Sequence, residues 1–268
     1  MARVADLRLH RIEVRSIFVR SVYSLASAPI LAMSFGGVAQ GQQTNIHVSM
    51  PPITDPDFRH EWQISTSYIS MNGQAINANG IDINNIFMSR PIRNDKATNF
   101  TLGTALLYGD MDIDSSRKGD LSSLIINGSS NKEYIVSRKP RSSLTLFVGI
   151  PFSFGDSIIE NIEDVTLYNL LAGVQAGARL SLRMGNVKTS PWLMVNLMGG
   201  YRERYGGGVY YENLNSGGVP IFAVVSSGLE ILYLPLDLTL DGIYQKTLES
   251  GNNEPIESVI IQLGFGLF

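Results

Sequence analysis

The stretch Asp164–Gly185, DVTLYNLLAGVQAGARLSLRMG, shows most clearly how this chain folds. From Thr166 to Met184 the even positions all tolerate an apolar setting, whereas most odd positions are polar residues or glycine. A period of two places successive side chains on opposite faces of a β-strand. The stretch therefore predicts one long strand with an apolar face and a polar, glycine-rich face.

The length of this alternation indicates a membrane environment. Ordinary strands contain about 5–6 residues, whereas a tilted strand that crosses a bilayer needs roughly 9–11. Here the alternation continues for about twice that length, which soluble β-sandwiches seldom sustain. We therefore predict an all-β fold, an antiparallel up-and-down transmembrane β-barrel.

The composition agrees with this fold and excludes several functions. The 268 residues include no cysteine, so the chain has no disulfide, thiolate metal site or cysteine nucleophile. Charged residues make up 17%, below the roughly 25% of typical soluble domains. Outside the amino terminus no run of about 20 apolar residues occurs, which argues against a helical membrane protein. The net charge of −3 gives no indication of nucleic-acid binding.

The first 39 residues resemble an export signal. Five arginines form a long basic region, followed by the small and apolar stretch Val22–Val38 and the cleavage context Gly37-Val38-Ala39. An uncleaved membrane anchor is the alternative. Residues 40–60 contain three prolines, which resist regular strand pairing, so we expect a periplasmic lead-in there.

Residues 61–268 are expected to form the barrel. Ten strands bring both termini to the same side, although eight or twelve remain possible because Gly80–Ser137 is irregular. Short turns are expected at Pro91–Lys96, Arg138–Arg141, Gly185–Ser190 and Leu234–Pro235. We expect long loops at Asp110–Ser130, with an optional small hairpin at Leu121–Asn127, and at Gly206–Gly218. The strands are expected at 61–71, 80–90, 97–109, from 132 to 137, 142–154, 164–184, 191–205, 219–233, 236–247 and 257–268.

Aromatic residues near the strand ends are candidates for the membrane interface, where amphipathic rings contact both lipid and water. The alternative is the ordinary preference of these residues for strands. The candidates are Trp62, Tyr68, Tyr108, Tyr168, Trp192, Tyr201, Tyr233 and Tyr244.

The chain resembles bacterial outer-membrane β-barrel proteins through its export signal, its alternating strands from Glu61 onward and its closing VIIQLGFGLF with a terminal Phe268. The resemblance implies residence in the cell outer membrane, contact with lipid and lipopolysaccharide, and recognition of the last strand by the barrel-assembly machinery. One departure is that the terminal hydrophobic residues do not share the parity of Phe268. A bulge, or a strand that ends before Phe268, would explain this difference.

A narrower resemblance lies in SSLTLFVGIPFSFG, which is followed by DVTLYNLLAGVQ. This succession is similar to the transporter-like family labelled as the MetA pathway of phenol degradation. The resemblance implies passage of small hydrophobic compounds.

Polar residues on the lumen parity form the candidate site. They would act either as a selectivity ring for a solute or as a group of ion pairs that fills a small barrel. The candidates are Asn169, Gln175, Arg179, Arg183, Glu230, Asp237 and Asp241.

Metal binding and catalysis have little support in the sequence. Asp110, Asp112 and Asp114 begin like a calcium loop, but Ser115 and Leu121 replace the required glycine and glutamate. A barrel hydrolase would need a serine beside a histidine, and the exported chain keeps only two histidines, both at or before the first strand. We expect no cofactor, no metal and no enzyme activity.

Two functions from different classes follow from these patterns. The first is a passive channel or transporter for small, potentially hydrophobic, molecules. The second is a closed structural or adhesion barrel whose extracellular loops bind partners. The packing of the lumen distinguishes them. A third possibility, a secreted soluble sandwich, predicts that the Leu and Phe rows pack inside.

Overall fold

We describe the fold from a computed structural model of the chain. The structure describes residues 62–73, 76–93, 96–114, 117–160, 165–206, 209–211, 221–249 and 255–267, all within the compact unit Ala39–Phe268. The expected signal and lead-in segments, and Phe268, lie outside the described residues.

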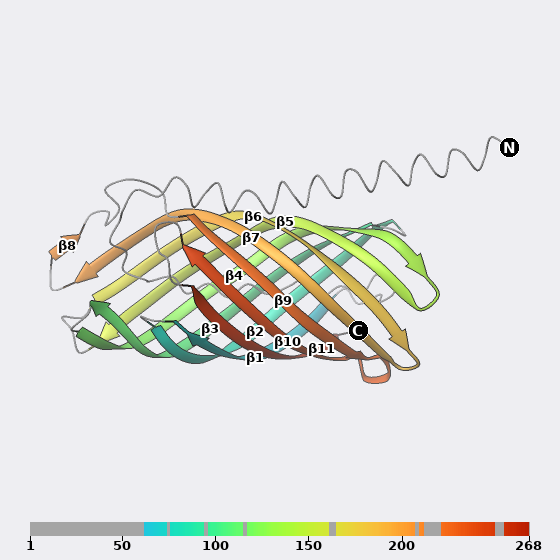
Figure 1. The fold of residues 1–268 in the computed structure, drawn as a ribbon, viewed down its shortest axis with the longest axis horizontal. Helices are drawn as coiled ribbons and strands as arrows, with labels where there is room; N and C mark the ends of the chain where they lie inside the picture. Colours follow the sequence, from blue (N-terminus) through green and yellow to red (C-terminus); the bar gives the residue numbers. More distant parts are fainter. Residues whose placement is uncertain are drawn as a thin grey trace. The chain divides into compact units, whose positions relative to one another are not determined.

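The described residues are almost entirely in strands (Figure 1). A single 3-10 turn, η1 at Leu234–Leu236, interrupts them. No helix within the described ranges is long and apolar enough to cross a membrane. The strands are β1 (Trp62–Asn72), β2 (Ile76–Arg93), β3 (Lys96–Asp114), β4 (Arg117–Lys139), β5 (Ser142–Glu160), β6 (Val165–Met184), β7 (Val187–Gly206), β8 (Val209–Tyr211), β9 (Ile221–Tyr233), β10 (Leu238–Glu249) and β11 (Ile256–Leu267).

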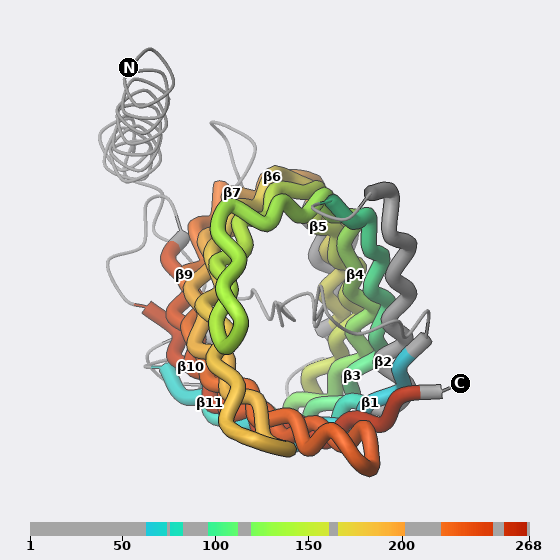
Figure 2. Tube along the Cα trace, turned by 90° about the vertical axis from the view of Figure 1, so that its right-hand side faces the viewer, coloured from blue at the N-terminus to red at the C-terminus, as the bar shows by residue number. Residues whose placement is uncertain are grey.

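Ten of these strands form a closed antiparallel ring, as Figure 2 shows from one end. Each long strand pairs with its neighbours in the chain, and β1 pairs with β11 over the whole length of β1, from Trp62 to Asn72. The short strand β8 pairs antiparallel with only the last three residues of β7. The predicted ten-stranded up-and-down barrel is therefore confirmed.

The register of the ring fixes the tilt of its strands. Pairing partners followed once around the ring lead from Phe147 to Ile159, which is twelve residues further along β5. Twelve residues correspond to about 40 Å along the strands, against a circumference of about 48 Å for ten strands, so the tilt is about 40°. The path runs through Gly177, Met194, Ser226, Gln245, Ser258, Met71, Ala78, Gly109 and Leu121.

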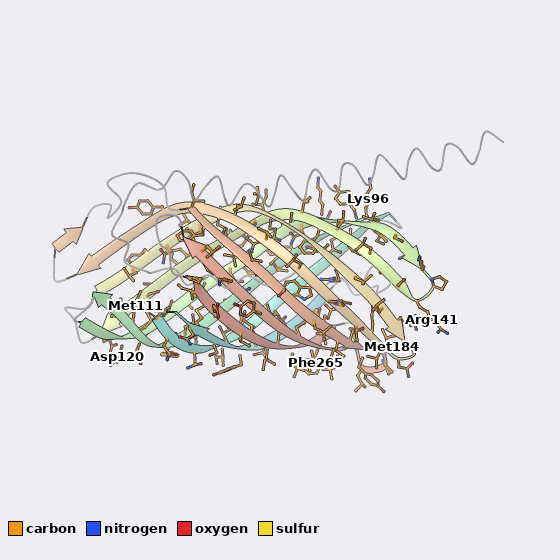
Figure 3. All side chains as sticks on the ribbon, in the orientation of Figure 1. Lys96, Met111, Asp120, Arg141, Met184 and Phe265 are labelled. Carbon is orange, nitrogen blue, oxygen red and sulfur yellow. The ribbon has the colours of Figure 1, made fainter. Side chains whose placement is uncertain are left out.

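The outer wall of the barrel is apolar. Many large hydrophobic side chains on the outward parity are 37–68% exposed, with Leu170 and Val174 of β6 and Ile150 of β5 among the most exposed. Phe265 likewise projects from the outer surface of β11 (Figure 3). Water-soluble proteins rarely expose so large an apolar area. The third possibility, a secreted soluble sandwich with these rows packed inside, is therefore wrong.

The two ends of the barrel differ in their connections. We call the end with the tight turns at 140–141, 185–186 and 234–237 the turn end, and the opposite end the loop end. Figure 3 places Arg141 and Met184 at the turn end and Met111 and Asp120 at the loop end. Gly185 has φ 61°, a left-handed conformation that glycine adopts without steric cost, and Asp237 adopts φ 47°. The turns expected at Arg138–Arg141, Gly185–Ser190 and Leu234–Pro235 are confirmed, although β7 begins earlier than expected, at Val187. The turn expected at Pro91–Lys96 is shorter, because β2 extends to Arg93 and β3 begins at Lys96.

The prediction of a long acidic loop at Asp110–Ser130 is wrong. Strand β3 continues to Asp114 and β4 begins at Arg117, so nearly all of this segment is paired strand. Within it Leu121 and Ile125 point inward and are buried, whereas Leu124 points outward. The serines and aspartates between them hid this alternation. Most of the other expected loop, Gly206–Gly218, lies outside the described residues.

A charge on the outer wall tests the membrane-facing assignment. Val174 lies midway along β6 and is 57% exposed. We expect Val174→Arg to lower the free energy of unfolding in lipid vesicles by about 2–4 kcal/mol, because an arginine at the bilayer midplane loses its hydration. Urea titration in vesicles measures this change, with Val174→Ile as the control. Equal stability of the two variants would contradict a lipid-facing wall.

Candidate functional site

The buried face of the sheet is the inner wall of the barrel. Gln63 on β1 donates from Nε2 to Thr239 Oγ1 on β10 over 2.7 Å, although β11 lies between these strands. Gln175 on β6 likewise donates to Asn131 on β4 across β5. Side chains from strands two apart can meet only on the concave face of a curved sheet. The alternating buried residues therefore line the lumen.

The lumen has an apolar half at the loop end. Residues that flank the loop-end connections on the inward parity are mostly hydrophobic and buried, and most of the hydrophobic ones belong to one contiguous cluster. The polar exceptions include Ser123 and Ser157, which share a hydrogen bond of 2.7 Å, and also Asn169, Gln245, Thr247 and Ser258. The residues of this half include Ile69, Met71, Ile76, Leu107, Met111, Leu121, Ile125, Ile159, Leu167, Leu171, Met198, Phe222, Val224, Ile256 and Ile260.

The turn-end half of the lumen is polar and hydrogen-bonded. The bonds form two arcs on the inner wall, one across β3, β4 and β6 and the other across β10, β11 and β1. The first arc contains Asn99 donating to Glu133 (2.8 Å), Thr101 with Ser129 (2.8 Å) and Asn131 donating to Ser129 (2.8 Å). The second contains Gln63 donating to Thr239 (2.7 Å) and Gln262 donating to Ser65 (2.6 Å).

Six of the seven lumen candidates from the sequence lie buried on the inner wall. They are Asn169, Gln175, Arg179, Glu230, Asp237 and Asp241. Arg183 differs: it is exposed at the turn end, where its Nε donates to the carbonyl oxygen of Gly185 over 3.3 Å. The inward parity of Arg183 was read correctly, but β6 ends one residue later and the side chain reaches solvent.

Three of these residues form a charged cluster, which comprises Arg179, Glu230 and Asp241. Glu230 on β9 and Asp241 on β10 are directly opposite each other, and both are buried. Like charges in this arrangement repel. The charge of Arg179 also acts on Asp241, and Arg179 is the largest fully buried side chain among the described residues. Attraction to Arg179 therefore offsets only part of the repulsion that Asp241 experiences from Glu230.

Two of the aromatic rings on the inner wall, those of Phe147 and Trp192, each lie over a glycine of an adjacent strand. Phe147 covers Gly177 on the adjacent strand, and Trp192 covers Gly228, so that a Cβ at either glycine would overlap the ring. The prediction that Trp192 lies at the membrane interface is wrong, because its side chain is only 5% exposed and faces inward. Its position at the start of a sequence-predicted strand suggested an outer location, whereas its parity in β7 is that of the lumen.

The other aromatic candidates lie elsewhere. Tyr68, Tyr108, Tyr201, Tyr233 and Tyr244 are exposed on the outer wall. The remaining two are Tyr168, which is half-buried, and Trp62, whose side chain is not described.

Several inner-wall residues were missed in the sequence. Asn131 and Glu133 belong to the part of β4 next to the segment that was read as a loop. Gln63, Ser67 and Gln262 lie on the correct parity of β1 and β11, but a single polar residue in an alternating strand is not distinctive. Pairing across the β1–β11 closure brings them together, and the sequence does not specify this pairing.

Within the described ranges, no group of three or more His, Cys, Asp or Glu side chains is arranged to hold a metal ion. The inner wall instead combines a few buried charges with amides and hydroxyls.

The closed antiparallel ring with an apolar outer wall defines the fold of an outer-membrane β-barrel. Solved structures similar to this one include the outer membrane protease OmpT from Escherichia coli, with 9% identity, 80% of this chain and 100% of that chain covered, and a TM-score of 0.47. They also include the transport unit of the autotransporter AIDA-I from Escherichia coli (9% identity, coverage 80% and 93%, TM-score 0.45) and the β domain of the Bordetella autotransporter BrkA (11%, 77% and 100%, 0.42).

Sequence comparisons add no family. No family model matches the chain, including that of the MetA pathway of phenol degradation, and no curated protein matches it. The likeness to solved structures concerns the barrel architecture alone.

The contact between Asn131 and Gln175 depends on the glycine between them. A Cβ on Gly149 would overlap Asn131 Oδ1, which accepts the hydrogen bond from Gln175. We expect Gly149→Ala to lower the free energy of unfolding by about 1–3 kcal/mol, because it displaces a buried hydrogen-bonded amide.

Gly242→Ala is the matched control for this variant, since a Cβ at Gly242 has no atom within 4 Å. Alanine lowers the backbone entropy of the unfolded chain relative to glycine. The control should therefore be as stable as the wild type or slightly more stable. Urea unfolding in detergent micelles compares the two variants. A Gly149→Ala protein as stable as the control would show that the contact is dispensable.

Proposed function

We propose that this chain is an outer-membrane β-barrel that acts as a passive transporter for small apolar or amphiphilic molecules, with a lumen that is closed at the charged cluster in the described state. The observation that carries the proposal is the division of the inner wall into an apolar half and a polar half. The activity has no catalytic step. Both candidate histidines, His47 and His60, lie outside the described residues.

The outer wall supports the membrane location. Exposed tyrosines lie near both ends of the apolar band, where rings of this type contact the headgroup region. Tyr68, Tyr108, Tyr201 and Tyr244 lie towards the loop end, and Tyr233 ends β9 at the turn end. Outer-membrane lipid and lipopolysaccharide would surround this wall. The outward row of β11, which ends in the Phe265 and Leu267 positions, is the surface that the barrel-assembly machinery would receive.

The apolar half of the lumen supports the choice of solute. An inner surface of aliphatic side chains and methionines favours apolar groups over ions, because it offers no replacement for the hydration of a charge. Methionine side chains also adapt to different shapes, and Met71, Met111 and Met198 all lie in this half. A molecule with one polar group would match both halves of the lumen.

The charged cluster supports the closed state. Arg179 is almost completely buried in the turn-end half, where its charge acts on the carboxylate of Asp241. A buried ion group of this kind retains its arrangement because separation of the charges leaves them uncompensated. Transport therefore requires the cluster to rearrange.

A second candidate, a closed structural barrel, is favoured by one observation. Nearly every inward side chain on the described strands is excluded from solvent, as in small barrels with filled interiors. In that case partner binding would use the loop-end connections. The segment Asp110–Ser130 would present only the tip of the β3–β4 hairpin rather than a long loop.

Permeability separates these two functions. We expect wild-type protein in liposomes to admit small neutral solutes slowly, and Arg179→Ala to raise the swelling rate several-fold, because removal of the largest buried side chain opens the turn-end half. Lys132→Ala, on the outer parity of β4, serves as a control that leaves the lumen unchanged. Heat-modifiable migration in gels verifies folding. A folded Arg179→Ala barrel with wild-type permeability would favour the structural function.

A further inference from the structure

Five oxygen-bearing side chains form a continuous row across the inner wall. Glu230 pairs with Asp241, Asp241 with Gln262, Gln262 with Ser67, and Ser67 with Asp82. The row crosses five adjacent strands, β9, β10, β11, β1 and β2, and all five residues are buried. We call these residues the oxygen row.

Several oxygens at the centre of the row have no hydrogen-bond partner. They are both carboxylate oxygens of Asp241, Oε1 of Gln262 and Oγ of Ser67. The exposed fractions of these residues are 0%, 1% and 4%. A buried acceptor without a partner costs about 1–3 kcal/mol, and more when it is charged. Such a group of adjacent acceptors is thus a candidate for a bound ligand.

The orientation of Gln262 is fixed by its other amide atom. Its Nε2 donates to Ser65 Oγ over 2.6 Å. The amide oxygen Oε1, and not the amide nitrogen, is therefore the atom without a hydrogen-bond partner in the row. This arrangement offers an acceptor beside Asp241 where a donor would have satisfied the carboxylate. The row therefore presents only oxygen atoms with free lone pairs. Such a row suits a positively charged ligand and does not suit a ligand that is itself a hydrogen-bond acceptor.

The spacing and charge of the row point to a metal cation. Side chains directly opposite each other on adjacent strands have Cβ atoms about 4.5–5.5 Å apart, so oxygens of Glu230, Asp241 and Gln262 can approach a common point. At Asp241 the repulsion from Glu230 exceeds the attraction to Arg179, which favours a further positive charge beside it. Carboxylate, amide and hydroxyl oxygens are the ligands of hard cations such as Ca²⁺.

We propose that Glu230, Asp241 and Gln262 form a binding site for a hard, oxygen-liganded metal cation on the inner wall of the barrel. The cation links β9, β10 and β11 and compensates the opposed carboxylates. With only two acidic ligands, the site differs from clusters built on three or more such residues. It requires no transport activity, so it stands independently of the proposed function.

Unfolding of the full-length protein in detergent tests the site. After treatment with a chelator, the urea midpoint is measured against CaCl₂ or NaCl concentration, with ionic strength held constant by choline chloride. A cation that binds only the folded barrel raises its stability in a saturable way. We expect saturable stabilisation by Ca²⁺ or Na⁺ and none by choline, whose bulky cation cannot use the site.

Variants connect this response to the oxygen row. We expect Asp241→Asn to weaken the apparent cation affinity at least tenfold, and Gln262→Glu, which adds a charged oxygen ligand, to strengthen it severalfold. Asp110→Asn is the matched control, because Asp110 is exposed on the outward parity of β3. This variant should respond like the wild type.

Two results would overturn the proposal. One is equal stabilisation by choline and by the metal cations, which would reduce the effect to ionic screening. The other is an unchanged cation response in a folded Asp241→Asn or Gln262→Glu barrel. If Asp241→Asn fails to fold, equilibrium dialysis of Gln262→Glu against radioactive Ca²⁺ provides the decisive comparison with wild type.

Discussion

Closure of the ring through β1 and β11 is the constraint on which the rest of this structure depends. Eleven consecutive residues of β1, Trp62–Asn72, pair with β11, so neither strand leaves an unpaired edge. In an apolar environment an unpaired backbone group costs several kcal/mol, so only a closed sheet is tolerated there. Closure also separates the two faces of every strand: the outward face contacts lipid, and the inward face is concave enough for side chains two strands apart to meet.

The two halves of the inner wall are packed in different ways. At the loop end the inward side chains form a hydrophobic cluster that resembles the core of a soluble protein. At the turn end they form hydrogen-bonded arcs around the buried charges of Arg179, Glu230 and Asp241. The polar half contributes specificity at an electrostatic cost, because its charges must remain compensated. A transporter and a cation-binding barrel would both use that half, whereas a purely structural barrel would gain more from an apolar filling.

The sequence predicted the barrel well because its main signal is local. Alternation in β5, β6 and β10 depends on the lipid on one side of each strand, and it needs no knowledge of neighbours. The same reasoning failed for the β3–β4 hairpin beyond Asp110, where both faces carry polar residues. It also misplaced Trp192, whose ring lies against Gly228 of the neighbouring strand. The contacts of Gln63, Asn131 and Gln262 depend on ring closure and strand register, which no single strand encodes.

The aromatic rings on the inner wall also discriminate between alternative alignments of the strands. Phe147 and Trp192 each lie over a glycine on an adjacent strand, Gly177 and Gly228. A shift of β9 by two residues relative to β7 preserves the inside and outside of both strands, yet it would place Ser226 or Glu230 beneath the indole. The hydrophobic pattern is the same in both alignments, so it does not discriminate between them. A side chain larger than glycine under the ring would clash with it, and this clash disfavours the shifted alignment. During assembly, these two ring–glycine pairs would therefore select the correct strand register in a sheet whose lipid-facing pattern also allows registers shifted by two residues.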